Sequence, residues 1–320
     1  MESLGLWHNS DMETRQKTQS WANFHQSLLV FAAIVAAVLI TFWLNTEPVY
    51  GAENNNQDNS LTQKVINLEQ ELASDIKTYG EDYPRVTKRR NNLGSVYAAL
   101  GKYQKAKGYF EQVLASSIKI FGEDHPNVAI VRSKLGGAYY ALGEYQKAIG
   151  YFEQALASDL KTLSKDHPKV ATNRNNLGLA YKKLGEYQKA IGYYKKALAS
   201  GLRTYGEDHP NVAIVRNNLG LAYHESGKYE RAIGYFEQAL ASDLKTLGKD
   251  HPKVATHRNN LGVAYYSFSN YQKAIDYFEQ ALATRIKVLG KKHLHTVQTR
   301  NYLYTARDVL ETETSVPLNR

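Results

Sequence analysis

The chain has 320 residues, is 43% hydrophobic and contains no cysteine. This composition can bury a long core, and the absence of cysteine excludes disulfides and thiolate metal sites. The formal net charge of +9 is unevenly spread, because residues 1–60 carry two bases and six acids, for −4, which leaves +13 on the rest. A basic domain favours acidic peptides or anionic surfaces as partners, although such a charge also serves solubility.

Residues 28–44 form an uncharged apolar run of 17 residues. As a helix this run would span about 26 Å, which is close to the ~30 Å hydrocarbon core of a bilayer. Arg15 and Lys17 precede the run, and no Lys or Arg follows it before Lys64. The positive-inside rule therefore predicts a single-pass membrane protein with residues 1–27 in the cytoplasm. The repeats that follow would be extracytoplasmic, and periplasmic if the protein is bacterial.

A cleaved secretory signal is the alternative interpretation of this run, with a cleavage site near residues 49–51 or 50–52. The mature protein would then be secreted. An uncleaved anchor is favoured because a signal core usually runs ~7–15 residues and the leader here is long. Residues 45–60 are polar and predict a flexible linker.

The rest of the chain repeats itself with a period of 42 residues. Residues 206–247 differ from residues 122–163 at nine of 42 positions, which predicts a stack of like structural units. The period predicts a partial repeat at 61–83 with a second helix only, and a partial repeat at 293–310 with a first helix only. Between them lie complete repeats at 84–125, 126–167, 168–209, 210–251 and 252–292, and a disordered tail occupies 311–320.

Each complete repeat predicts two helices. In the second repeat Pro126 suits a first helical turn, Asp124 is placed to cap it, and Gly143 suits the turn between the helices. An arginine recurs in the first helix of every unit, and we expect it to pair with the preceding Asp75, Asp159 or Asp243 where one is present. The four histidines of the Asp-His-Pro turns are expected to be turn and cap residues. Neighbouring repeats lie ~10 Å apart, too far for one zinc ion to collect ligands at ~2.0–2.2 Å.

One signature occurs five times along the chain: Leu93, Gly94, Tyr97, Ala106, Phe110 and Val113 in its first copy. This pattern resembles the tetratricopeptide repeat. The longer period, the Asp-His-Pro turn and the Arg-Asn-Asn-Leu-Gly motif are similar to the repeats of kinesin light chains. The resemblance implies an all-α, right-handed superhelical solenoid of helix pairs, here preceded by one transmembrane helix. Its concave groove, lined by first helices, would bind a peptide or partner domain. No long heptad segment is present, so a motor-cargo role is not implied.

Within this groove the resemblance places a recurring asparagine on the first helices, at Asn91, Asn175, Asn217 and Asn259. A row of amides would hold the backbone of an extended peptide, and the alternative is that these amides bond between neighbouring helices. Selectivity would fall to positions of the same helices that vary between repeats, namely Tyr140, Lys182, Lys183, His224 and Tyr266. The two lysines are expected to be exposed, which favours an acidic partner.

No catalytic arrangement, phosphate loop or metal-ligand pattern occurs in the sequence, so we expect no enzyme activity, no cofactor and no metal. The sequence predicts a non-catalytic protein-protein interaction scaffold that is tethered to a membrane through residues 28–44. The alternative is a basic solenoid that binds nucleic acid or another anionic polymer. It would require a cytoplasmic repeat domain with its bases on one continuous face, so nucleic acid is the less favoured partner.

Overall fold

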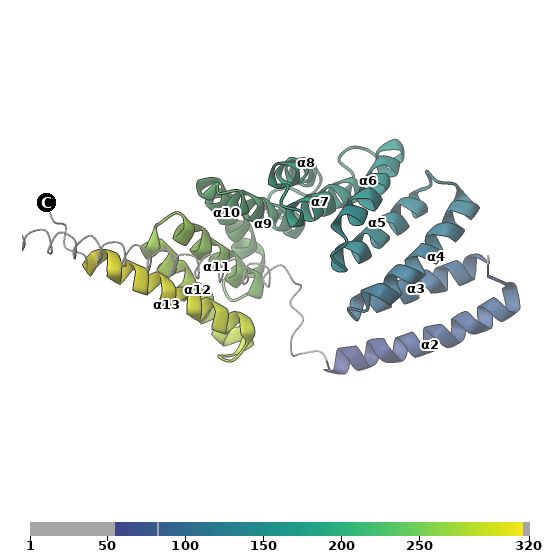
Figure 1. Cartoon of the computed structure of the whole chain (residues 1–320), viewed down its shortest axis with the longest axis horizontal. Coiled ribbons are helices and arrows are strands. Elements are labelled where there is room, and N and C mark those ends of the chain that lie inside the picture. Colours follow the sequence, from purple (N-terminus) through teal and green to yellow (C-terminus); the bar gives the residue numbers. More distant parts are fainter. Residues whose placement is uncertain (1–54, 82, 316–320) are drawn as a thin grey trace, which may run out of the picture. The chain divides into compact units, whose positions relative to one another are not determined.

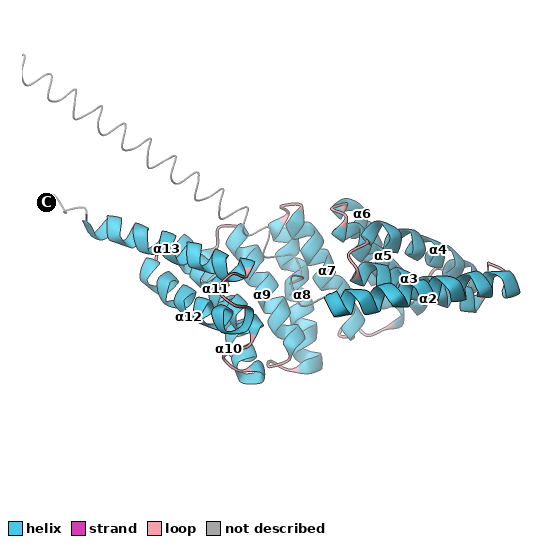
Figure 2. Ribbon diagram, turned by 90° about the horizontal axis from the view of Figure 1, so that it is seen from below, coloured by secondary structure: helices cyan, strands magenta, loops and turns pink. Residues whose placement is uncertain are grey.

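The structure is a computed structural model that describes residues 55–81 and 83–315. This part of the chain consists of twelve helices joined by short loops, and it contains no strand (Figure 2). The predicted cytoplasmic segment 1–27, the predicted membrane span 28–44 and most of the predicted linker lie outside the described residues. Among the helices that are described, none has the length and apolar character needed to cross a membrane.

Five helix pairs form the body of the array, and each pair packs on the next (Figure 1). The first helices of the pairs are α3 (Pro84–Ala99), α5 (Pro126–Ala141), α7 (Pro168–Lys183), α9 (Pro210–Glu225) and α11 (Pro252–Ser267). The second helices are α4 (Tyr103–Phe121), α6 (Tyr145–Thr162), α8 (Tyr187–Tyr205), α10 (Tyr229–Leu247) and α12 (Tyr271–Leu289). The repeat boundaries predicted from the prolines therefore coincide with the starts of the first helices.

A single helix lies at each end of the array. Helix α2 (Asn55–Tyr79) corresponds to a second helix, and α13 (Leu294–Ser315) to a first helix. Helix α2 begins six residues before the predicted partial repeat, within the segment expected to be linker. Helix α13 continues five residues into the predicted tail.

The histidine of each Asp-His-Pro turn caps the first helix. His125, His167, His209 and His251 are N-cap residues whose Nδ1 atoms accept a hydrogen bond from the backbone N–H two residues later, at 3.1–3.2 Å. The prediction that these are cap residues is confirmed. The expectation that Asp124 caps the helix was wrong, because His125 occupies that position and Asp124 pairs instead with Lys161 at the end of α6.

The turn inside each pair requires a left-handed residue, which glycine adopts without a steric penalty. Gly101, Gly143, Gly185 and Gly227 have φ between 69° and 79°. In the fifth pair Ser269 has φ of 59° and is the one non-glycine residue with positive φ in the described part of the chain. The turn predicted at Gly143 is thus confirmed, and the same position serves as the turn in the other pairs.

The two helices of a pair cross where the first helix carries glycine. A Cβ atom built at Gly136 would lie 2.7 Å from Cε1 of Phe152, and one at Gly220 would lie 2.5 Å from Cε1 of Phe236. No real Cβ tolerates such a contact, so the aromatic ring of the second helix needs this glycine. Each ring is almost fully buried there.

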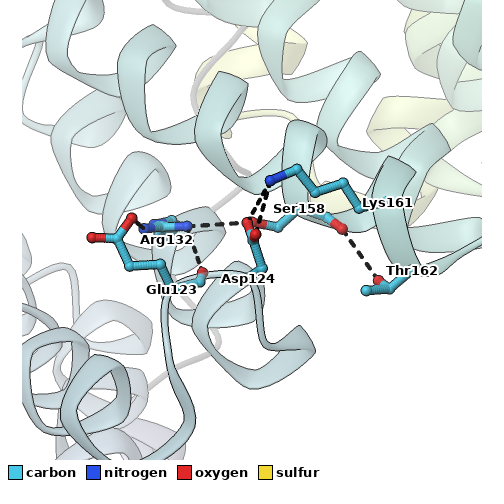
Figure 3. Close-up of polar contacts among 6 residues, drawn as sticks. All are labelled: Glu123, Asp124, Arg132, Ser158, Lys161 and Thr162. Carbon is cyan, nitrogen blue, oxygen red and sulfur yellow. Dashed lines mark hydrogen bonds and ion pairs between the residues drawn. The ribbon is translucent and has the colours of Figure 1, made fainter.

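The recurring arginine ties each first helix to the turn before it. Arg90, Arg132, Arg174, Arg216, Arg258 and Arg300 each donate to the backbone carbonyl nine residues earlier, at 2.9–3.2 Å. Arg132 also donates to Ser158 Oγ on α6 at 3.3 Å (Figure 3). The expected pairing with the preceding aspartates was wrong. A carbonyl is available in every repeat, whereas an aspartate is present in only some of them.

Those aspartates form a second pattern, in which the junctions from α2 to α11 alternate in polarity. Asp75, Asp159 and Asp243 are buried and contact polar residues of the next first helix: Arg89, Asn173 and His257 respectively, at 2.9–3.1 Å. The two intervening junctions hold Ser117 with Val131 and Gly201 with Val215 at these positions. From Asp75 to Asp243 buried polar contacts therefore recur at every second junction, whereas the last junction, at Arg285 and Thr299, is polar again.

Candidate functional site

All nine predicted site residues lie on the first helices, and we call the row that they form the first-helix face. Neighbouring first helices are offset so that a residue meets the residue 43 positions later in the chain. Asn218 donates to Asn175 Oδ1 at 3.0 Å, and Asn260 donates to Asn217 Oδ1 at 2.9 Å. Lys134 donates to Asn91 Oδ1 at 2.9 Å. The offset is thus one repeat plus one residue.

The recurring asparagines therefore link neighbouring helices. Asn259 is fully buried, and its Oδ1 accepts from Thr299 at 2.9 Å and from Arg285 at 3.3 Å. Asn91, Asn175 and Asn217 are half-buried, and their carbonyl oxygens are occupied in the same way. This arrangement is the interhelix alternative considered from the sequence. A peptide backbone at this row would have to share these oxygens.

Lys182 lies in the middle of the row and is only 4% exposed. Its Nζ donates to Glu225 Oε1 at 3.0 Å, across the same offset of 43 residues. The expectation that Lys182 is exposed was wrong, because the neighbouring first helix covers it and supplies a carboxylate. The ion pair neutralises the positive charge of Lys182, on which the predicted preference for an acidic partner depended.

Three of the varying positions hold rings that are braced by the following helix. Tyr140, His224 and Tyr266 are half-buried, and they pack against Tyr145, Tyr229 and Tyr271 with ring centroids 5.3–5.4 Å apart. The bracing tyrosine is the first residue of each second helix. Both rings of a pair therefore sit on rigid helices, which holds the half-exposed ring in one orientation. Such fixed, partly exposed rings are typical anchors at protein interfaces.

The central part of the row is buried enough to change how its groups titrate. Burial, with a further contribution from the neighbouring Lys182, lowers the pKa of His224 to about 4, so this ring is neutral at pH 7. Its Nε2 lies 2.9 Å from Ser267 Oγ, again at an offset of 43 residues. Burial also lowers the pKa of Lys134. The first-helix face therefore presents fewer free charges than its sequence indicates, and Lys183, which is half-buried, is the lysine of the predicted pair that lies nearer to solvent.

The site residues that the sequence did not reveal are the partners: Glu225, Ser267 and the bracing tyrosines. Tyr194 is a further one, since it stands where the equivalent residue of the other four pairs is phenylalanine, and its hydroxyl is buried without a partner. A comparison of each residue with the position 43 further on would have found Glu225 and Ser267. In the described part of the chain, no three His, Asp or Glu side chains are placed to hold a metal ion.

Comparison with known proteins agrees with this architecture. Two profiles, both described as tetratricopeptide repeat, match the chain, one at residues 86–161, 151–201 and 169–245 and the other at residues 254–295. These matches cover more than half of the sequence, and the protein belongs to the tetratricopeptide repeat family. The resemblance found in the sequence is confirmed. A search among curated proteins gave no match.

Solved structures show the same fold. The crystal structure of BtubC (BKLC) from P. vanneervenii is 26% identical with a TM-score of 0.59, and the match covers 75% of this chain and 94% of that chain. A crystal structure of nearly identical TPR-like repeats, assigned to a kinesin light chain of Podosopora anserina, is 29% identical with a TM-score of 0.57. That match covers 64% of this chain and 97% of that chain. Proteins of this family typically act as protein-protein interaction scaffolds without catalysis.

Proposed function

We propose that the protein is a non-catalytic scaffold whose first-helix face binds a peptide or a domain of a partner protein. The observation that carries this proposal is the set of braced rings at Tyr140, His224 and Tyr266. Their ring positions recur on one face, they are half-buried, and their orientation is held by helix-borne tyrosines. Pre-organised rings lower the entropy lost on binding, so they suit apolar or aromatic anchors of a partner.

The preference for an acidic partner rests on fewer groups than the sequence indicated. Lys182 is neutralised by Glu225, and Lys183 is the half-buried lysine of that pair. A charge at the rim of an interface acts mainly on the association rate and on the salt dependence. We therefore propose that the braced rings supply most of the affinity and that Lys183 contributes selectivity.

A peptide-display screen against the full-length chain tests the proposal. Selected peptides are then titrated against the single variants Tyr140→Ala, His224→Ala and Tyr266→Ala. Phe121→Ala is the matched control, because Phe121 is an exposed ring (44%) at the end of α4, outside the first-helix face. Loss of a central aromatic anchor typically costs ~2 kcal/mol or more. Selected peptides whose affinity is unchanged by all three ring variants would place the binding site elsewhere.

The membrane tether and the extracytoplasmic location of the repeats are also proposals, and they are supported by the sequence of residues 15–44 alone. Fractionation of cells that express the full chain, followed by protease treatment of intact spheroplasts, tests both. The nucleic-acid alternative is disfavoured by the mixed charges of the array, in which four bases at the ends of second helices pair with aspartates of the turns: Lys161, Arg203, Lys245 and Lys287. Binding of duplex DNA with a steep salt dependence would restore that alternative.

A further inference from the structure

A ladder of tyrosine and glutamate joins α2, α4, α6 and α10 to the first helix that follows each of them. Tyr97, Tyr139, Tyr181 and Tyr265 donate their hydroxyl protons to Glu69, Glu111, Glu153 and Glu237 respectively, at 2.5–3.0 Å. In each case the glutamate lies 28 residues before the tyrosine. Burial, together with this hydrogen bond, raises the pKa of Tyr139 and of Tyr181 to about 12.

A cation accompanies each rung of the ladder. Lys105, Lys147, Lys189 and Lys273, each eight residues after the tyrosine, place Nζ over its ring at 5.0–5.4 Å from the centroid. Each of these rings also stacks on a tyrosine from the second helix of the same pair, with ring centroids 5.4–5.7 Å apart. A complete rung therefore contains one carboxylate, one hydroxyl and at least one ammonium, and a second ammonium, that of Lys107, lies over the ring of Tyr139 at 5.4 Å.

The rung at Tyr223 is different. Its ring stacks on Tyr235 at 5.5 Å, as in the other rungs, and Arg231 lies over it at 5.7 Å. The position 28 residues earlier is Lys195, whose Nζ lies 6.0 Å from the ring centroid. Within the described part of the chain, the Tyr223 hydroxyl has no hydrogen-bond partner and neither cation has a carboxylate partner. The carboxylate of the other rungs is thus replaced by a second positive charge.

The helix that carries Lys195 strengthens this difference. In α8 the Glu-Gln pair of the other second helices is replaced by Lys195 and Lys196, and both side chains are exposed. Lys196 lies over the ring of Tyr193 at 5.7 Å from its centroid. The rungs on either side keep their own carboxylates, Glu153 and Glu237. The positive region is therefore confined to one rung, between two rungs that already hold an acid.

We propose that the α8–α9 junction binds a single carboxylate from an acidic residue of a partner protein, held by Tyr223, Lys195 and Arg231. The four complete rungs show that a carboxylate fits against a tyrosine hydroxyl in this setting, and charge-assisted hydrogen bonds favour it here. A long polyanion such as nucleic acid fits poorly, because it would meet Glu153 or Glu237 on either side. The partner segment would carry one Glu or Asp flanked by neutral or basic residues. This site is independent of the binding proposed for the first-helix face.

The test uses the full-length chain with ¹³C-labelled tyrosine rings, and the Tyr223 signal is assigned through Tyr223→Phe. The probes are an acetylated, amidated pentapeptide with one central Glu between alanines, its Gln counterpart and a short duplex DNA. The Glu peptide should shift the Tyr223 signal in a saturable manner, and the Gln peptide should not. Lys195→Glu restores an internal carboxylate, so this variant should lose the response and melt at a higher temperature than the wild type.

A gain-of-function variant serves as the matched control. Glu153→Lys recreates the Lys195 arrangement at the rung of Tyr181, and it should add a second saturable response, at the Tyr181 signal. Two outcomes overturn the proposal: the absence of a saturable shift at Tyr223, or an equal shift in Lys195→Glu. A response to DNA that exceeds the response to the Glu peptide, and that disappears in Lys195→Glu, would replace the protein partner by a nucleic acid.

Discussion

Lys182 on α7 and Glu225 on α9 form a buried ion pair across a boundary between repeats, with Nζ 3.0 Å from Oε1. The lysine side chain is 2% exposed and the glutamate side chain 19% exposed. Removal of one partner leaves the other charge buried without compensation, which is more costly than removal of both.

The pair leads to the first prediction. Glu225→Leu should lower the free energy of unfolding by about 3–5 kcal/mol, because it strands the more deeply buried Lys182. The double variant Lys182→Met with Glu225→Leu should recover most of this loss. Urea unfolding of the wild type, both single variants and the double variant gives the coupling energy. If the single and double variants are equally stable, the lysine is solvated in solution.

The second prediction concerns two adjacent glycines of α5. Gly136→Ala should destabilise the protein by roughly 1–3 kcal/mol, because the new Cβ would lie 2.7 Å from the Phe152 ring. Gly137→Ala is the matched control, because nothing lies within 4 Å of its Cβ position. That change should stabilise the helix by up to ~1 kcal/mol. In thermal unfolding, Gly136→Ala should therefore lower the melting temperature and Gly137→Ala should raise it. Shifts of the same sign would contradict the packing of Gly136 against Phe152.

The third prediction is a pH dependence from Asp159. Burial raises the pKa of this carboxyl, and its partner Asn173 is neutral. The native state therefore retains a proton that the unfolded state releases near pH ~3.9, so stability falls as the pH rises from there through the raised native pKa. Asp159→Asn removes this loss of stability at higher pH, because the amide does not ionise. The new amide can also donate to the unpartnered Oδ1 of Asn173.

This variant should therefore be more stable than the wild type at pH 7, with a smaller advantage at pH 4. Urea unfolding at the two pH values measures the difference. Asp243→Asn is the control, since the carboxylate there contacts His257 and its loss should destabilise the protein at pH 7. An Asp159→Asn variant that is less stable than wild type at pH 7 would show that the carboxylate is ionised and well compensated.

The fourth prediction concerns Ser269, which adopts the left-handed conformation at φ 59° that glycine occupies in the other four turns. Ser269→Gly should stabilise the protein by several tenths of a kcal/mol up to ~1 kcal/mol, because a Cβ is disfavoured in that region. The reverse change, Gly227→Ser, should destabilise it by a similar amount. Thermal unfolding of the two variants tests both directions.

The sequence alone predicted the helices well because their signals are local. Pro126 and Gly143 act on the backbone within one turn, so the 42-residue period was sufficient to place the helix boundaries. It predicted contacts between repeats less well. The offset of 43 residues arises from how two packed helices are displaced, and no single repeat carries that information. For this reason Lys182 was expected in solvent, although a carboxylate covers it from the next helix.

The prediction of the N-cap of α5 failed for a different reason. Asp124 and His125 both have side chains that can accept a hydrogen bond, and general preference favours the aspartate. The position of Pro126 determines which residue caps the helix. Pro126 is the first helical residue, so His125 directly before it is the N-cap. Asp124 then lies one residue too early, where its carboxylate reaches Lys161. Position within the turn therefore outweighed residue preference.

The alternation of polar and apolar junctions governs how such a chain can change in length. Removal of one repeat, residues 168–209, would bring the buried Asp159 against Val215, and the carboxylate would lose its polar partner. Removal of two repeats, residues 168–251, would bring Asp159 against His257, a pairing that the chain already uses at Asp243. Between residues 168 and 251, recombination should therefore be tolerated in a step of 84 residues and selected against in a step of 42. In this stretch of the array the unit that can be lost or gained without a stranded carboxylate is the double repeat.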